Sequence, residues 1–213
     1  MQKQRSAFAR RMRKVARCTV PSSLSRPTHD QPYKVLAVCT GNICRSPAVE
    51  RLLARGLDDS VSTSSAGTQA MAGQAISAPM VPLIQAHDGA ADGFVARQLT
   101  EDIIRGADLV LALTRAHRAA VVEACPSAVR RTFTLREFAR LLSQIEPAEL
   151  SGSNDAERLH KAVPLAAAQR GRKQVTPADD DVVDPYRRSE QVYAEAMAQI
   201  LPAVQLITGS LGR

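Results

Sequence analysis

Short apolar runs alternate with helix-like segments along most of the chain. Four runs have the length of buried strands, and they cover residues 35–38, 61–65, 109–113 and 131–135. Each run is followed by a segment with a helical pattern, over 48–53, 77–87, 115–123 and 136–142. Strands that alternate with helices are typical of a parallel sheet covered on both faces. The pattern therefore predicts an α/β fold, a doubly wound four-stranded parallel sheet with helices on both faces.

Two further segments complete the predicted domain. The apolar residues of 189–206 recur at helical spacing, which predicts a closing amphipathic helix. Residues 143–181 are more polar and contain one short helical pattern, over 156–169. We interpret this stretch as a surface insert within a domain that covers residues 34–213.

The excess basic charge of the chain lies in its first 33 residues. This segment holds eight Lys and Arg residues and one acid, whereas the remainder holds 20 basic and 20 acidic residues. Its Arg-rich composition and its Pro and Ser residues predict a disordered N-terminal extension over 1–33. A domain without net charge gives no reason to expect specific nucleic-acid binding, and only the extension could make non-specific contacts.

Composition narrows the class of protein further. Four cysteines without the spacing of a disulfide framework or a zinc site predict a reducing, cytoplasmic location and no metal. No stretch approaches 18 uncharged apolar residues, and the basic N-terminus is not followed by an apolar segment. We therefore expect neither a membrane span nor a secretory signal. Aromatic residues make up 3% of the chain, which predicts an aliphatic core.

The candidate chemistry lies where the first apolar run ends, at Cys39-x5-Arg45. Five intervening residues let the backbone wrap around a phosphate-sized dianion, with the following helix N-terminus adding its positive end. The same field stabilises a thiolate, so Cys39 is the candidate nucleophile. Arg45 can offer two parallel N–H donors to phosphoryl oxygens, which a lysine cannot do.

The other residues of this loop suit a phosphate site as well. Gly41 permits close backbone approach, and Asn42 tolerates a left-handed conformation and can brace the loop. Ser46 offers a hydroxyl donor to the thiolate. We expect the loop to bind phosphate through Thr40, Gly41, Asn42, Ile43, Cys44 and Ser46.

At this loop the sequence resembles a known family. VCTGNICRSP, over 38–47, looks like the phosphate loop of low-molecular-weight protein-tyrosine phosphatases, and the resemblance extends over about 34–206. It implies a phosphatase I-like fold and hydrolysis of phosphotyrosine in proteins through a cysteinyl-phosphate intermediate. It also implies a phosphorylated protein as substrate, no cofactor, and a monomer or weak dimer.

A phosphatase of this kind needs an acid that protonates the departing oxygen. VVDPY, over 182–186, resembles the late Asp-Pro-Tyr loop of the family, so Asp184 is the candidate general acid and Tyr186 a candidate wall for the substrate ring. The stretch 64–68 resembles the one in which a serine braces the loop asparagine, which points to Ser65.

The chain departs from the family pattern at two positions. Phe94 stands where the family has a loop-bracing histidine, and Met71 stands where an aromatic wall is common. These departures leave Tyr186 as the aromatic wall, so the reaction is more firmly indicated than the preference for phosphotyrosine.

Three alternative functions remain open. Relatives that dephosphorylate arginine resemble the chain over 114–117, although a threonine tends to stand in them where this chain has Ile43. Arsenate reductases that resemble this family need two further cysteines in a mobile segment, whereas only Cys125 lies outside the loop and the extension. The third alternative is a phosphate-binding module without turnover. Cys44 either forms a reversible disulfide with Cys39 or only packs the loop.

Overall fold

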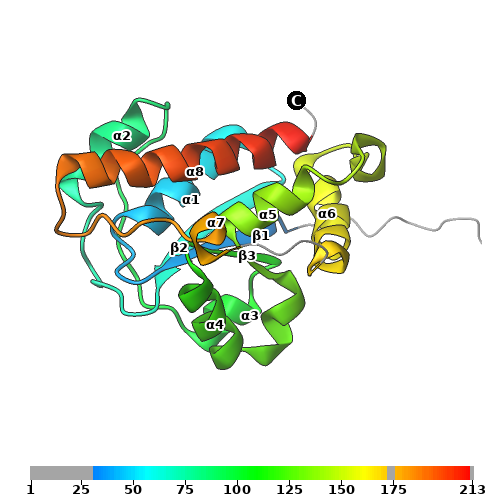
Figure 1. Ribbon diagram of the computed structural model, residues 1–213, viewed down its shortest axis with the longest axis horizontal. Coiled ribbons are helices and arrows are strands. Elements are labelled where there is room, and N and C mark those ends of the chain that lie inside the picture. Colours follow the sequence, from blue (N-terminus) through cyan, green and yellow to red (C-terminus); the bar gives the residue numbers. More distant parts are fainter. Residues whose placement is uncertain (1–30, 172–175, 212–213) are drawn as a thin grey trace, which may run out of the picture. The chain divides into compact units, whose positions relative to one another are not determined.

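Four parallel strands form one sheet in the order β2-β1-β3-β4 (Figure 1). The strands are β1 (Tyr33–Cys39), β2 (Val61–Gly67), β3 (Leu109–Ala112) and β4 (Thr132–Thr134). The computed structural model describes residues 31–171 and 176–211, which belong to one compact unit. Most of the predicted extension lies outside these residues, and β1 begins one residue earlier than the predicted domain.

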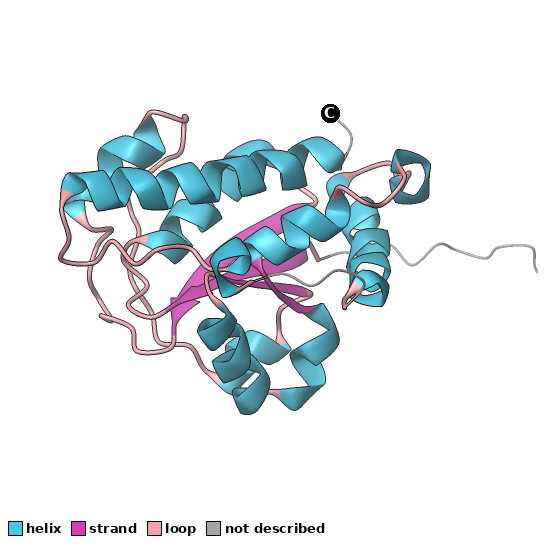
Figure 2. Ribbon diagram, in the orientation of Figure 1, coloured by secondary structure: helices cyan, strands magenta, loops and turns pink. Residues whose placement is uncertain are grey.

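Apolar side chains cover both faces of the sheet at its central strands, as a doubly wound sheet requires. Val35 and Ala37 of β1 belong to one apolar cluster, and Leu36 and Val38 belong to another. The first cluster lies under α1 (Arg45–Gly56), α5 (Leu135–Leu142) and α8 (Glu190–Ser210). The second lies under α3 (Glu101–Arg105) and α4 (Arg115–Ala124), on the opposite face of the sheet (Figure 2). The predicted four-stranded α/β fold is confirmed.

The helix predicted over 77–87 is shorter and split. A 3-10 turn, Ala78–Met80, leads into the five-residue α2 (Val81–Gln85). Pro79 and Pro82 stand at the starts of these two pieces. Proline lacks a backbone N–H and cannot continue a regular helical ladder, which explains the break. The predicted closing helix is present as α8 and extends four residues beyond 206.

The polar stretch over 143–181 contains a 3-10 turn (Pro147–Leu150), α6 (Asp155–Gln169) and α7 (Pro177–Asp180). Leu159 and Ala166 of α6 are buried in the larger apolar cluster. The side chain of Asp155 accepts a hydrogen bond from the backbone N–H of Asp58, 2.8 Å away. The stretch therefore packs against the domain, and its description as an insert stays a prediction.

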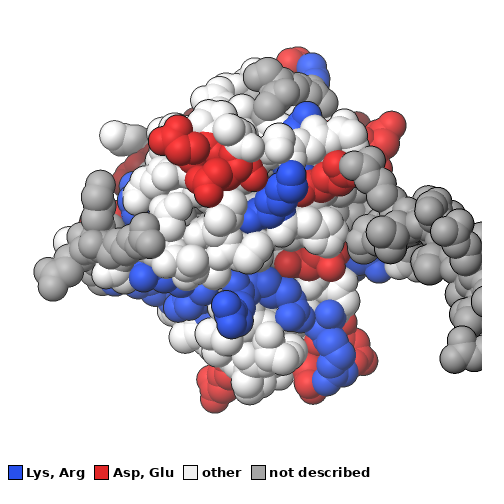
Figure 3. Space-filling view, turned by 90° about the vertical axis from the view of Figure 1, so that its right-hand side faces the viewer, with Lys and Arg blue, Asp and Glu red and all other residues white. Residues whose placement is uncertain are grey.

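Charged side chains of both signs occupy the face on the side of α6. Figure 3 shows a band of Lys and Arg across this face, with Asp and Glu gathered on both sides of it. In the part of the chain that the structure describes, no helix has the combined length and apolar character that a membrane crossing needs.

Candidate active site

The loop between β1 and α1 lies at the carboxyl edge of the sheet. β1 ends at Cys39 and α1 begins at Arg45, so both ends of the loop are held by regular structure. Both side chains are almost completely buried, with 2% of Cys39 and 4% of Arg45 exposed. Ligands in open parallel sheets bind at this edge, and the first turn of α1 adds its N–H groups there.

Donors surround the sulfur of Cys39. Its Sγ atom lies 3.0 Å from Oγ of Ser46 and 3.3 Å from the backbone nitrogen of Asn42, which donates to it. Two groups of the loop therefore form hydrogen bonds with the Cys39 sulfur.

Asn42 braces the loop from the side away from the pocket. It is fully buried and has a left-handed backbone conformation, with φ of 55°. Its amide Nδ2 donates to Oγ of Ser46 at 3.0 Å and to Oγ of Ser65 at 2.7 Å. Its Oδ1 accepts the backbone N–H of Arg97 at 2.9 Å. The Asn42 side chain thus connects the start of α1, strand β2 and the backbone at Arg97.

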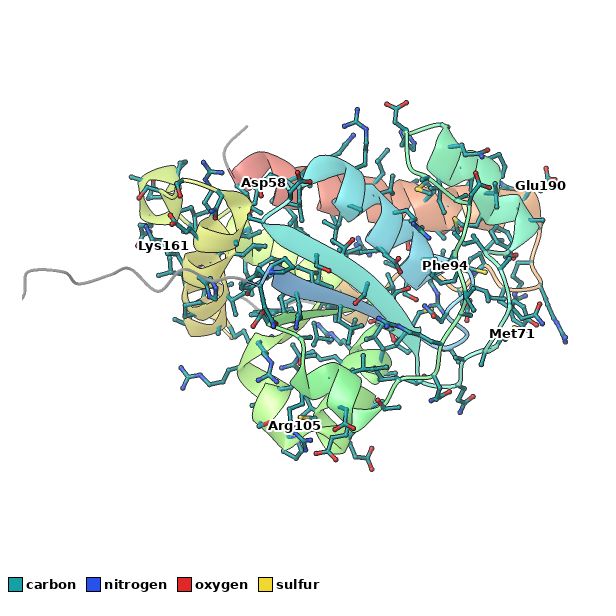
Figure 4. The ribbon with its side chains drawn as sticks, turned by 180° about the vertical axis from the view of Figure 1, so that it is seen from behind. Asp58, Met71, Phe94, Arg105, Lys161 and Glu190 are labelled. Carbon is teal, nitrogen blue, oxygen red and sulfur yellow. The ribbon has the colours of Figure 1, made fainter. Side chains whose placement is uncertain are left out.

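Phe94 has no bracing role of the kind a histidine would have. The Arg51 guanidinium lies over its ring, 5.7 Å from the centroid, and the Arg97 backbone supplies the donor to Asn42. Figure 4 shows Phe94 and Met71 at the same end of the molecule. In this chain the donor to Oδ1 of Asn42 is therefore a backbone N–H, which no residue type in the sequence indicates.

A second loop, residues 67–71, forms backbone hydrogen bonds with the first one. The carbonyl oxygens of Cys39, Thr40 and Gly41 accept N–H bonds from Thr68, Gln69 and Met71, at 2.9, 3.0 and 2.9 Å. These three carbonyl oxygens therefore point away from the pocket and toward the second loop. Gly67 permits the close approach, since a Cβ atom there would lie 2.3 Å from the carbonyl oxygen of Thr40.

Asp184 reaches the loop from a distant part of the sequence. Its Oδ2 lies 2.7 Å from Nη2 of Arg45, and its Oδ1 accepts the backbone N–H of Tyr186 at 3.2 Å. Nη1 of Arg45 donates to the carbonyl oxygen of Val182 at 3.2 Å. About half of the Asp184 side chain, 54%, is exposed, so it can exchange protons with solvent.

These groups surround a pocket of about 290 Å³. It is lined by Cys39, Thr40, Gly41, Ile43, Cys44, Arg45, Gln69, Met71, Asp184 and Tyr186. Of the predicted phosphate-binding residues, Asn42 and Ser46 do not line it, and Ser65, which we expected to brace the loop, contacts Asn42. Gln69 is a lining residue that the sequence did not indicate, because its position depends on the hydrogen bonds between the two loops.

His117 is a further residue of the site that sequence reasoning missed. Its Nε2 lies 2.8 Å from Oγ1 of Thr40, and its Nδ1 lies 2.9 Å from Oγ1 of Thr114. Burial, and next the charge of Arg45, lower the pKa of His117 to about 4. The ring is therefore neutral at neutral pH. The Thr-x-x-His spacing at the start of a helix was the available signal.

The buried Cys44 lines the pocket together with Cys39. Its Sγ lies 3.7 Å from the hydroxyl of Tyr193, which lies 2.9 Å from Oγ of Ser77. Burial raises the pKa of the Cys44 thiol. Among the described residues, no group of three His, Cys, Asp or Glu side chains is arranged to hold a metal ion.

The sequence is similar to known phosphatases. The model of the family "Low molecular weight phosphotyrosine protein phosphatase" matches residues 34–163. The low molecular weight protein-tyrosine-phosphatase Wzb of Salmonella typhi is 38% identical over 93 residues, which is 44% of this chain and 62% of Wzb. The chain thus spans less than two thirds of that relative. A protein-arginine-phosphatase of Geobacillus stearothermophilus is 37% identical over 107 residues, 50% of this chain and 72% of that protein.

The fold is similar to solved structures as well. The crystal structure of the Erwinia amylovora tyrosine phosphatase AmsI superimposes with a TM-score of 0.62 at 25% sequence identity. The superposition covers 87% of this chain and 97% of AmsI.

Proposed function

Since the chain belongs to the low molecular weight phosphotyrosine protein phosphatase family, we propose that it hydrolyses phosphotyrosine in proteins. The observation that carries the proposal is the convergence of three groups on one pocket. Cys39 supplies a nucleophile held by donors, Arg45 a guanidinium, and Asp184 a carboxyl group in contact with it. A nucleophile, a phosphate ligand and an acid are the parts that phosphoryl transfer to sulfur requires.

In the first step the Cys39 thiolate attacks phosphorus and the bond from phosphorus to the tyrosine oxygen breaks. The proton of Asp184 goes to that oxygen, so tyrosine leaves as a neutral phenol. The Arg45 guanidinium and the loop N–H groups bind the three remaining phosphoryl oxygens. The product is a cysteinyl phosphate with Asp184 ionised.

In the second step the Asp184 carboxylate takes a proton from a water molecule, whose oxygen attacks phosphorus. The bond from sulfur to phosphorus breaks and the electron pair returns to Cys39 as a thiolate. Inorganic phosphate leaves. Ser46 Oγ, 3.0 Å from the sulfur, stabilises the departing thiolate in this step.

The walls of the pocket support an aryl substrate. Ile43 and Met71 line it together with the Tyr186 ring, and these apolar surfaces suit a flat ring bound to the phosphate. Phosphoarginine is the second candidate, because one relative is a protein-arginine-phosphatase. Ile43 supports the first candidate, since its side chain offers no hydroxyl to a guanidinium.

The test is phosphate release from two peptides, one phosphorylated on tyrosine and one on arginine, by the full chain without added metal. Cys39→Ser is the inactive variant, and Cys125→Ser is its matched control, because Cys125 is buried in the apolar cluster on the other face of the sheet. We expect release from the phosphotyrosyl peptide that Cys39→Ser abolishes and Cys125→Ser retains. Preferential release from the phosphoarginyl peptide would overturn the proposed preference for phosphotyrosine. Absence of release from either peptide would favour a phosphate-binding module without turnover.

We also propose a cytoplasmic location and a monomer or weak dimer. Three cysteines of the described residues, Cys39, Cys44 and Cys125, are free thiols, which suits a reducing compartment. Arsenate reduction has less support, because Cys125 does not line the pocket. Sedimentation over a range of protein concentrations tests the oligomeric state.

A further inference from the structure

The Thr40 hydroxyl is held by a residue from a different element of the fold. Thr40 follows the nucleophile directly and lines the pocket. Its Oγ1 lies 2.8 Å from Nε2 of His117, in the first turn of α4. Only 7% of His117 is exposed, so this contact is largely protected from water. The hydrogen bond to Thr40 connects this buried imidazole directly with a residue that lines the pocket.

Thr114 contacts both the backbone and the ring of His117. Thr114 is the N-cap of α4, and its Oγ1 accepts the backbone N–H of His117 at 3.1 Å. The same oxygen lies 2.9 Å from Nδ1 of the ring. A hydroxyl that accepts a backbone N–H still has its own hydrogen to donate, and Nδ1 is the acceptor within reach. On this basis we assign the neutral tautomer with its proton on Nε2.

This tautomer determines the direction of the next hydrogen bond. Nε2–H donates to Oγ1 of Thr40, so the hydrogen of the Thr40 hydroxyl is left for another acceptor. The pocket beside it is where phosphoryl oxygens are expected to bind. In this arrangement Thr114 donates to His117 and His117 donates to Thr40.

We propose that His117 is a positioning residue that orients the Thr40 hydroxyl to donate to a phosphoryl oxygen. The proposal rests on the proposed phosphatase function and adds a side-chain donor to the backbone N–H groups of the loop. A donor that is already oriented binds the charge of the transferring group without reorganisation. Its loss should therefore lower kcat and weaken the affinity for inorganic phosphate.

The experiment is a double-mutant cycle with Thr40→Val and His117→Phe. We expect each substitution to lower kcat on a phosphotyrosyl peptide about 10-fold, and the double variant to be no slower than either single variant. Thr40→Ser and His117→Gln keep a hydroxyl and an N–H donor, so they should restore most of the activity. Independent effects, with an about 100-fold loss in the double variant, would overturn the proposal, as would full activity of His117→Phe.

A second measurement separates this proposal from the proposed function. The dissociation constant for inorganic phosphate is measured by calorimetry for the same variants, with no turnover required. We expect the same non-additive loss of affinity even if the protein hydrolyses no phosphotyrosine. If His117→Phe does not fold, His117→Ala, which also lacks an N–H donor, takes its place in the cycle. Unchanged phosphate affinity in Thr40→Val would show that the hydroxyl does not bind the phosphate.

Discussion

Nη2 of Arg45 and Oδ2 of Asp184 lie 2.7 Å apart, so the residue expected to bind phosphate forms an ion pair with the expected general acid. The two side chains differ in accessibility, since 4% of Arg45 and 54% of Asp184 is exposed. A phosphate dianion competes with Asp184 for the guanidinium, because Arg binds phosphate and carboxylate with the same N–H groups. Binding of substrate would therefore free the Asp184 carboxyl for proton transfer.

Asp184→Asn should slow turnover far more than it affects stability. We expect kcat on a phosphotyrosyl peptide to fall about 10²- to 10⁴-fold, because an amide cannot protonate the leaving oxygen. Asp184 is about half exposed, and Arg45 keeps its hydrogen bond to the Val182 carbonyl, so the free energy of unfolding should change by only about 1 kcal/mol. On an aryl phosphate whose leaving group is more acidic than tyrosine, kcat of this variant should fall less, because the leaving oxygen needs less help from an acid. Steady-state kinetics on both substrates and urea unfolding check this.

Asp179→Asn is the matched control for that prediction. Asp179 lies in α7 on the same segment of the chain, and its Oδ2 accepts hydrogen bonds from Thr176 instead of lining the pocket. Its replacement should leave kcat unchanged. An equal fall of kcat in both variants would mean that Asp184 contributes only to the negative charge of this segment and is not the general acid.

Two substitutions at Asn42 should separate the effect of its backbone conformation on stability from the effect of its side chain on kcat. Its φ of 55° is left-handed, so Asn42→Ala should be less stable than Asn42→Gly by about 1 kcal/mol. Both variants lack the amide that contacts Ser46, Ser65 and Arg97, so both should lose a similar share of kcat. Urea unfolding and kinetics measure the two effects.

Asp88→Gly provides a comparison for the backbone effect. Asp88 also has a left-handed conformation, with φ of 58°, but it lies outside the active-site pocket. Glycine there should not lower kcat. If Asn42→Gly retained full activity as well, the bracing by the Asn42 amide would have no part in catalysis.

His117 should make the protein sensitive to mild acid. Its pKa is lowered from an ordinary 6.5 to about 4, so the unfolded chain binds this proton at a higher pH than the folded one. The folded state is therefore fully favoured above about pH 6.5 and loses stability as the pH falls toward 4. At pH 5 the loss from this residue is about 2 kcal/mol. Urea unfolding at pH 7.5 and pH 5 measures it.

His117→Gln removes the titrating ring and keeps an N–H donor. This variant should lose about 2 kcal/mol less than the unaltered protein between the two pH values. Identical losses in the two proteins would show that other groups, such as carboxylates, cause the acid sensitivity.

Cys44 should protect Cys39 from irreversible oxidation. Peroxide converts the Cys39 thiolate to a sulfenic acid, and the Cys44 thiol can then displace water to form a disulfide. Activity lost to peroxide should return with a thiol reductant in the unaltered protein and much less in Cys44→Ser. Cys125→Ser is the control, because Cys125 contacts Ser127 away from the pocket. Equal recovery in Cys44→Ser would contradict a protective role.

The sequence was most informative where the determining residues are close together in the chain. The runs that became β1 and β3 are apolar on both faces, which fits a covered parallel sheet. The loop from Cys39 to Arg45 is one contiguous segment, so its spacing alone indicates a phosphate cradle. The helix over 77–87 was predicted too long, because Pro79 and Pro82 divide it.

Tertiary structure decided which distant residues meet that loop. The sheet order places β3 beside β1, and this brings the start of α4, with His117, against Thr40. It also brings the backbone of Arg97 to Asn42, a contact that no residue type encodes. The sequence by itself determined the fold class and indicated the candidate nucleophile and phosphate loop, because local spacing and polarity specify them. Only the tertiary structure decided that His117 and the Arg97 backbone contact this loop, because strand order sets which elements become neighbours.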